Sequence, residues 1–305
     1  TSAMRRLRTR DTRTRSSAEN TEGLLARELR YARRVSSTQT LVGRVFDLPV
    51  HRSSRWIFNC YVIEGDDGPV FVDPGLPSTA QGAIDIASVL DWPTPDAPAS
   101  ALCTHGHVDH LSGLPLLVSR LDTAAFLPAR CEAYLNGELP RNFDAKTTLR
   151  FLPFVGQQPF ELGSLVELAK VSQVGFGGAN AAFRFPFATP GFLRDGDPVP
   201  GASTWRIITT PGHSDDSVSL YHADSATLIS GDAVLTIDGR AWFNPESLDD
   251  AQSRQSEEKL RALKVRHLLP GHGLPVSGDP WRRALSHDAQ VPGNGLLARC
   301  VRRFL

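Results

Sequence analysis

Four side chains that can bind a metal ion lie within six consecutive residues, His-Gly-His-Val-Asp-His at positions 105–110. Three imidazoles and a carboxylate placed this closely crowd one another at high cost unless a cation holds them together. Imidazole and carboxylate ligands without a thiolate suit zinc, iron and manganese about equally well. The hexapeptide therefore predicts a metal site in preference to the alternative, a chance histidine-rich loop.

Three further candidate ligands each follow a short apolar run and stand next to glycine, which lets the backbone turn sharply at a strand end. They occur in the sequences Pro-Gly-His, Gly-Asp and Pro-Gly-His-Gly. Together with the hexapeptide they make seven candidate metal ligands: His105, His107, Asp109, His110, His213, Asp232 and His272. The other histidines are expected at the surface or behind the ligands; they are His51, His222, His267 and His287.

The seven candidate ligands can bind the same metal ions only if the strands before them end at a common edge of the fold. In the first half the pattern of apolar residues predicts strands at 41–50, 55–64, 69–73 and 101–104, with helices at 79–91 and 114–121. The hexapeptide lies where the strand at 101–104 ends. In open α/β sheets the carboxyl ends of strands are where binding sites are built. The second half predicts strands at 206–210, 217–222, 226–229 and 265–269, and a helix at 251–263.

Between the two halves, residues 125–190 are rich in phenylalanine and glycine and show no clear periodicity. One interpretation is an extra helical hairpin that completes the core. The other is a cap that shapes a hydrophobic substrate pocket. Aromatic content alone does not separate core from pocket, so both interpretations stay open.

The ordered motifs His-X-His-X-Asp-His, Pro-Gly-His, Gly-Asp and Pro-Gly-His-Gly resemble those of the metallo-β-lactamase fold superfamily, and within it the dinuclear branch that includes glyoxalase II. The resemblance covers residues 41–278. It implies an α/β fold of four layers, an αββα sandwich of two mixed β-sheets flanked by helices, with an inserted segment. Two metal ions would lie at one edge of the paired sheets.

The resemblance also implies a role for each ligand. His105, His107 and His213 would hold the first metal ion, Asp109, His110 and His272 the second, and Asp232 would bridge the two. Asp73 matches an aspartate that supports the site from behind the ligands in this family. The expected cofactor is therefore a pair of divalent metal ions, zinc before iron or manganese.

Details within the family narrow the expected activity. Histidine at position 107, rather than glutamate, does not fit the flavodiiron pattern. Asp232 stands where β-lactamases of this fold carry cysteine or serine. The complete set of seven ligands argues against a mononuclear iron sulfur dioxygenase. One departure from the family is Ser-Asp-Asp-Ser at 214–217 in place of the common Thr-Pro-Gly-Ser, which changes the turn behind His213 and its charge.

Two neighbouring cations lower the pKa of a bridging water from about 15.7 toward neutrality and so supply hydroxide. We therefore expect a hydrolase of a thioester, a lactone or another ester, with Asp109 as the candidate catalytic residue that manages the proton. The alternatives are a phosphodiesterase or nuclease of the same fold, the sulfur dioxygenase, and a binding or sensor protein without catalysis. A nuclease would need a basic surface near the site.

The net charge of zero conceals an uneven distribution. Residues 1–34 carry ten arginines and four acids, and residues 279–305 carry five arginines and two acids, so residues 35–278 have a net charge of −9. An acidic body suits bound cations and makes a nucleic-acid partner unfavourable; a small-molecule substrate is expected.

We expect a basic N-terminal arm or helix at 1–40, the catalytic domain at 41–278 with its insertion at 125–190, and a basic C-terminal helix or tail at 279–305. That tail is expected to dock on the acidic body, with a dimer partner or an acidic membrane surface as alternatives.

Four scattered cysteines without a Cys-X-X-Cys pair fit free thiols in a reducing compartment. No apolar run has the length of a membrane span. The residues before Met4 are interpreted as a cloning remnant, and the arginine-rich stretch after it lacks the apolar segment of a secretory signal. These features predict a cytoplasmic location. A homodimer stays open.

Overall fold

The computed structural model describes residues 41–92, 99–155, 158, 160–170, 174–177, 180–187, 190–292 and 296–304. All of these belong to one compact unit that spans residues 40–305. The N-terminal arm or helix expected at 1–40 lies outside the described residues.

Seven strands form the first sheet, in the order β1-β2-β3-β4-β5-β6-β9. The first four strands pair antiparallel, and β4, β5, β6 and β9 pair parallel. The carboxyl ends of β4 and β5 therefore lie at the same edge. The strands are β1 (Leu41–Arg44), β2 (Val50–Arg55), β3 (Phe58–Glu64), β4 (Pro69–Val72), β5 (Ser100–Leu102), β6 (Ala124–Pro128) and β9 (Gly191–Leu193).

Six strands form the second sheet, in the order β10-β11-β12-β13-β16-β17. Because β12 runs antiparallel to both neighbours and β13 pairs parallel with β16, the strands β11, β13 and β16 all run in one direction. The strands are β10 (Pro198–Val199), β11 (Ala202–Thr209), β12 (Val218–His222), β13 (Thr227–Gly231), β16 (His267–Pro270) and β17 (Val276–Ser277). A separate hairpin, β14 (Val234–Ile237) and β15 (Arg240–Phe243), follows β13.

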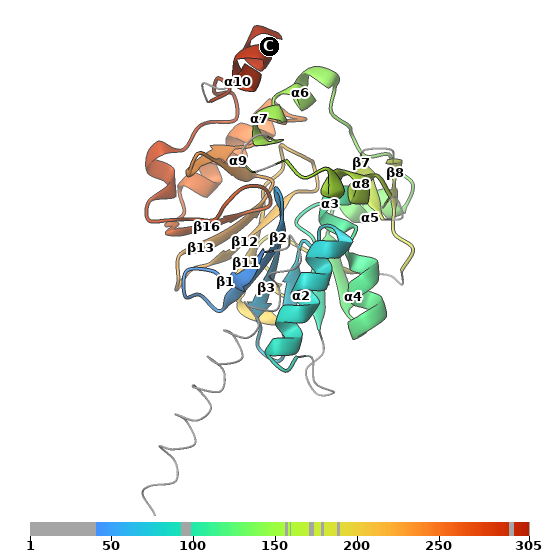
Figure 1. Cartoon of the computed structure of the whole chain (residues 1–305). Coiled ribbons are helices and arrows are strands. Elements are labelled where there is room, and N and C mark those ends of the chain that lie inside the picture. Colours follow the sequence, from blue (N-terminus) through green and yellow to red (C-terminus); the bar gives the residue numbers. More distant parts are fainter. Residues whose placement is uncertain are drawn as a thin grey trace, which may run out of the picture. The chain divides into compact units, whose positions relative to one another are not determined.

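The two sheets pack face to face and helices cover their outer faces. A core cluster joins Tyr61 of the first sheet to Trp205 and Leu269 of the second. Leu268, which points to the opposite face of β16 because side chains alternate along a strand, packs in another cluster with Leu260 of α9 (Asp250–Arg261). On the other side, α2 (Pro77–Val89) packs against β2 and β3, and α4 (Leu114–Leu121) packs against α2 and β6 (Figure 1). The expected αββα sandwich is confirmed.

Several element bounds differ from the sequence-based expectation. The run at 41–50 is not one strand, because Phe46 and Asp47 have positive φ angles of 49° and 59° in a tight turn between β1 and β2. Another turn, with Trp56 at a φ of 52°, delays the start of β3 to Phe58. Phe46 and Trp56 are aromatic, and aromatic residues are typical of strands, so the sequence pattern placed both turns inside strands. The hairpin of β14 and β15 was not predicted.

The expected inserted segment begins with β6, which is a strand of the first sheet. We use "the insert" for the described residues between 131 and 187. It is not a helical hairpin: it consists of four short helices and a two-stranded hairpin. These are α5 (Cys131–Leu135), α6 (Ala145–Leu149), α7 (Leu152–Val155), α8 (Leu162–Lys170), β7 (Gly175–Gly177) and β8 (Asn180–Arg184).

The C-terminal region packs on the body of the same chain. The 3-10 helix η2 (Pro280–Arg283) contacts β15, and α10 (Leu296–Phe304) contacts α7. Ala298 and Val301 of α10 are buried against Phe154 and Trp242. Within the described ranges, no helix combines the length and the apolar character needed to span a membrane.

Candidate metal centre

The structure brings all seven candidate ligands to one edge of the sandwich. The hexapeptide follows β5, and its last two ligands lie on the short helix α3 (Val108–Leu111). His213 follows β11, Asp232 comes directly after β13, and His272 comes two residues after β16. Since β11, β13 and β16 run in the same direction, their carboxyl ends deliver these three side chains to one place. The ligand atoms form three groups, within each of which they lie no more than 4.8 Å apart.

The first group consists of His105, His107 and His213. Nε2 of His105 lies 2.9 Å from Nδ1 of His107, and the same Nδ1 lies 3.2 Å from Nε2 of His213. Three ring nitrogens thus converge, from a strand end in each sheet. Three histidine nitrogens are a common ligand set for zinc.

Asp232 lies between this group and the remaining ligands. Its Oδ1 is 3.4 Å from Nε2 of His110, and its Oδ2 is 3.6 Å from Nε2 of His213 and 3.3 Å from Nε2 of His272. Oδ2 of Asp109 is 3.2 Å from Nε2 of His272 and 3.8 Å from Nε2 of His110. One carboxylate therefore faces histidines of both expected ion positions. The assignment of each ligand to an ion remains a prediction.

The histidine nitrogens that face away from the centre have partners of their own. Nδ1 of His213 donates to the carbonyl oxygen of Glu246 at 3.0 Å, and Nδ1 of His272 donates to that of Ile57 at 3.1 Å. Nδ1 of His110 lies 3.0 Å from Oδ2 of Asp73 as an ion pair, without a hydrogen bond. Such partners orient the ring and set its tautomer, so that Nε2 is free to bind a cation. Asp73 is held in turn by the amide and hydroxyl groups of Thr104.

Two buried polar atoms at the middle of the cluster test whether a metal fits. Nε2 of His110 and Oδ1 of Asp232 are both buried and have no hydrogen-bond partner, although they lie only 3.4 Å apart. A buried polar atom without a partner costs about 1–3 kcal/mol. A cation bound to both atoms would satisfy them. The residues therefore fit divalent metal ions, in their donor types and in their unsatisfied atoms.

Burial and charge act differently on the ligands. Burial lowers the pKa of His107 and of His213 to about 4, so both rings are neutral at neutral pH and can offer a lone pair. Burial also opposes the charge on His272, but the carboxylates of Asp232 and Asp109 outweigh it and raise the pKa of His272 to about 10. A cation that binds His272 near neutral pH must therefore displace a proton.

Asp216 supports the hexapeptide, a role that sequence reasoning missed. The amide of Gly106 donates to Oδ2 of Asp216 at 2.7 Å, and the thiol of Cys131 donates to the same oxygen at 3.2 Å. The carbonyl oxygen of Gly106 accepts from the amide of Phe176 at 2.9 Å. The peptide between two ligands is therefore held on both sides. The signal was the Asp-Asp departure after His213, which predicted a changed turn and a changed charge but no contact with the hexapeptide.

A pocket of about 810 Å³ opens over the ligands. Its floor includes His107, Asp109, His213, Asp232 and His272. The insert supplies most of the remaining lining, namely Asn142, Phe143, Thr148, Phe151, Leu165, Leu168, Ala169, Phe176, Gly177, Asn180 and Ala181. This lining favours the cap interpretation of the insert, whereas Phe154, buried beside Trp242, serves the core. Among the described residues that line the pocket, none is lysine or arginine.

Comparison with known proteins gives matches along most of the chain. A family model described as "Metallo-beta-lactamase superfamily" matches residues 55–272, which include all seven candidate ligands. "Probable metallo-hydrolase YflN" of Bacillus subtilis (strain 168) is 26% identical over 264 residues, which are 79% of this chain and 89% of that protein. "Acyl-coenzyme A thioesterase MBLAC2" of Bos taurus is 28% identical over 225 residues, which are 70% of this chain and 72% of that protein. The solved structure "Crystal structure of TTHA1623 in a di-iron-bound form" superposes with a TM-score of 0.47 at 21% identity, over 73% of this chain and 91% of that one.

Proposed function

Since this chain belongs to the metallo-beta-lactamase superfamily and is a metallo-hydrolase of that superfamily, we propose that it hydrolyses an ester-type bond, in a thioester, a lactone or another ester. One observation carries this proposal. Asp232 faces His110, His213 and His272 beneath a pocket that has no lysine or arginine in its described lining.

The side chains that line the pocket favour ester hydrolysis over the alternative, phosphodiester hydrolysis. A phosphodiester substrate carries negative charge along its backbone, and proteins bind such backbones with lysine and arginine. The pocket instead offers phenylalanine and leucine side chains from the insert and the carboxyl group of Glu246. A thioester, lactone or other ester needs no cation beyond the metal ions. The printed name of the Bos taurus relative, an acyl-coenzyme A thioesterase, agrees with this class.

The proposed cofactor is a pair of divalent ions, zinc before iron or manganese. His105, His107 and His213 would hold one ion, Asp109, His110 and His272 the other, and Asp232 both. Bound there, the ions supply Lewis acidity and lower the pKa of water from about 15.7 toward about 7.

The chain's own residues complete the proposed reaction. Burial opposes the charge on Asp109, but His110 and His272 outweigh it and hold the pKa of this carboxyl below its usual value, so Asp109 is ionised at neutral pH. Its side chain is one-fifth exposed (21%), and it lines the pocket. Because it is ionised and reaches the pocket, Asp109 is the side chain proposed to take a proton from water and pass it to the leaving group. The rings of Phe143, Phe151 and Phe176 from the insert line the pocket beside this carboxylate.

Metal analysis and substrate cleavage on one preparation test the proposal. We expect close to two divalent ions per chain and turnover of a thioester, a lactone or a simple ester, with a phosphodiester left intact. Fewer than about one ion per chain without esterase activity would refute the hydrolase. Cleavage of the phosphodiester alone would favour the alternative, phosphodiester hydrolysis.

A further inference from the structure

We infer that the group attached to the scissile carbonyl is an uncharged hydrocarbon chain of several carbons, seated against the insert. This inference rests on the proposed function and narrows it to one class of substrate. It is carried by the contacts between the ligand histidines and the insert, and by the positions of the nearby charges.

Phenylalanine rings of the insert lie directly against ligand histidines on both sides of the cluster. The ring of Phe151 lies 5.3 Å from that of His272. The ring of Phe143 lies 5.0 Å from that of His213, and Phe176 lies 4.6 Å from His107. A substrate carbonyl placed over the ligands therefore has aromatic surface on either side. The substrate atoms next to that carbonyl would pack on these rings, which favours apolar groups there.

Helix α8 extends this apolar surface away from the ligands. Leu165, Leu168 and Ala169 occur at helical spacing and line the same pocket. The side chain of Leu165 is 37% exposed, so this surface reaches solvent. The pocket volume of about 810 Å³ lies in the range that encloses a substrate of drug size. An extended hydrocarbon chain matches such a surface.

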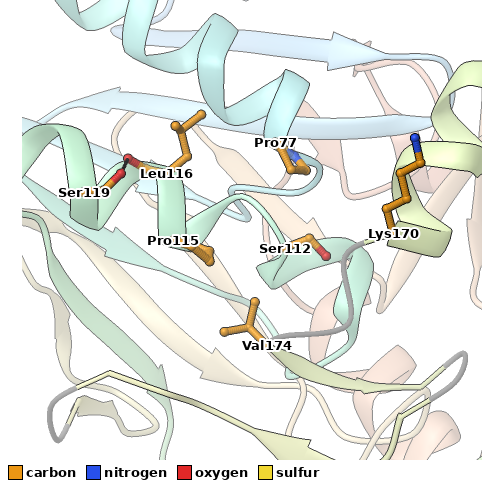
Figure 2. A pocket seen from close by; sticks show the side chains of 7 residues that line it. All are labelled: Pro77, Ser112, Pro115, Leu116, Ser119, Lys170 and Val174. Carbon is orange, nitrogen blue, oxygen red and sulfur yellow. Dashed lines mark hydrogen bonds between the residues drawn. The ribbon is translucent and has the colours of Figure 1, made fainter.

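Three cationic side chains in or beside the insert have their contacts outside the metal pocket. Lys170, the last residue of α8, lines a different pocket of about 340 Å³ with Pro77, Ser112 and Val174, as Figure 2 shows. Arg55 pairs with Glu161 and Glu167, and Arg150 donates to the carbonyl oxygen of Ala289.

Apart from the ligand histidines, the ionisable side chains that line the metal pocket are carboxylic acids, namely Asp109, Asp232 and Glu246. A carboxylate or phosphate at the far end of a substrate would lose its water there and gain no partner. The pocket therefore disfavours an acyl group that carries a negative charge.

A series of p-nitrophenyl esters tests the inference on the metal-loaded protein. We expect kcat/KM to rise about fourfold for each added methylene from acetate to octanoate, which is the value of burying one methylene. The pentanoate ester should exceed its terminally carboxylated counterpart, the hemiglutarate, by about tenfold or more. An active enzyme with a flat chain-length profile, or with a preference for the hemiglutarate, would overturn the inference.

Two matched variants locate the effect on the lining of the pocket. Leu165→Lys places a cation in the pocket and should lower kcat/KM for the octanoate and raise it for the hemiglutarate. Leu162→Lys adds the same charge to the same helix at a side chain that is 63% exposed and outside the pocket lining. It should leave both values unchanged. Equal effects of the two variants would contradict the assignment.

A binding measurement separates failure of the inference from failure of the proposed function. 2-Octanone presents a hydrocarbon chain and cannot be hydrolysed, and 2-butanone is its short control. Calorimetric titration should detect tighter binding of 2-octanone, and Leu165→Lys should weaken it. Such binding without any ester cleavage would overturn the proposed function alone. Ester cleavage with equal binding of the two ketones would overturn the inference alone.

Discussion

The edge that carries the ligands and the insert that covers it are built in different ways. The ligands come from the ends of strands in two large sheets, and their backbone is held by sheet pairing and by buried contacts such as that between Gly106 and Asp216. The insert has no helix longer than the nine residues of α8, and its hairpin has strands of three and five residues. The residues of the proposed reaction thus follow regular strands of the sheets, and the residues proposed to select the substrate lie on irregular structure.

The two regions are nevertheless in contact. Phe176 of the insert pairs with Gly106 through its backbone, and Gly175 packs so tightly that an added Cβ would lie 2.8 Å from the carbonyl oxygen of Gly106. Phe151 touches His272. If the edge binds the metal ions and the insert binds the substrate, changes at the edge should remove metal and activity, and changes in the insert should alter selectivity alone.

The largest effect is expected for Asp232→Ala. The variant removes the carboxylate that faces His110, His213 and His272, so activity should fall by about a thousandfold or more. Metal content per chain, measured on the same sample, should fall as well. Full retention of activity would refute a shared ligand at this position.

Asp73→Asn should weaken metal binding by about 10- to 100-fold, because it removes the charge that faces Nδ1 of His110 without changing the size of the side chain. Competition with a chelator measures the affinity. Asp85→Asn on α2, where the aspartate accepts from Gln81, is the control. Similar losses in both variants would show that the contact with His110 does not matter.

The affinity for metal should depend on pH with a definite sign. The carboxylates around His272 raise its pKa to about 10, so below that pH a proton occupies the nitrogen that the cation needs. Lowering the pH from 8 to 6 should therefore weaken binding at this position by about tenfold per unit. Calorimetry in two buffers with different ionisation enthalpies should detect one proton released per ion bound there. Affinity independent of pH over this range would contradict the assignment of His272.

The smallest effect is expected in the insert. Phe151→Ala removes apolar surface from the pocket and should lower kcat/KM for p-nitrophenyl octanoate by about fivefold, with little change for the acetate. Metal content should be unchanged. Loss of metal together with loss of selectivity would refute this division of roles, because the insert would then help to hold the metal ligands in place.

The turns around β1 and β2 show where prediction from the sequence lost accuracy. Phe46 and Trp56 are aromatic residues in left-handed turn conformations, and their composition suggests strands. By contrast, α4 is predicted with its bounds correct, because its apolar spacing and the proline in its first turn are local features. The seven candidate ligands were also proposed from local features, since each follows an apolar run and has glycine beside it or near it.

The sequence by itself determined the fold family and the candidate ligands, because short motifs at strand ends carry that information within a few residues. Only the tertiary structure decided which phenylalanines line the pocket and which fill the core: Phe151 and Phe154 are three residues apart, yet one contacts His272 and the other stacks on Trp242. It also revealed that Asp216 holds the hexapeptide and that Lys170 lines another pocket. These roles depend on contacts between residues distant in the chain, and no local pattern of residue types encodes them.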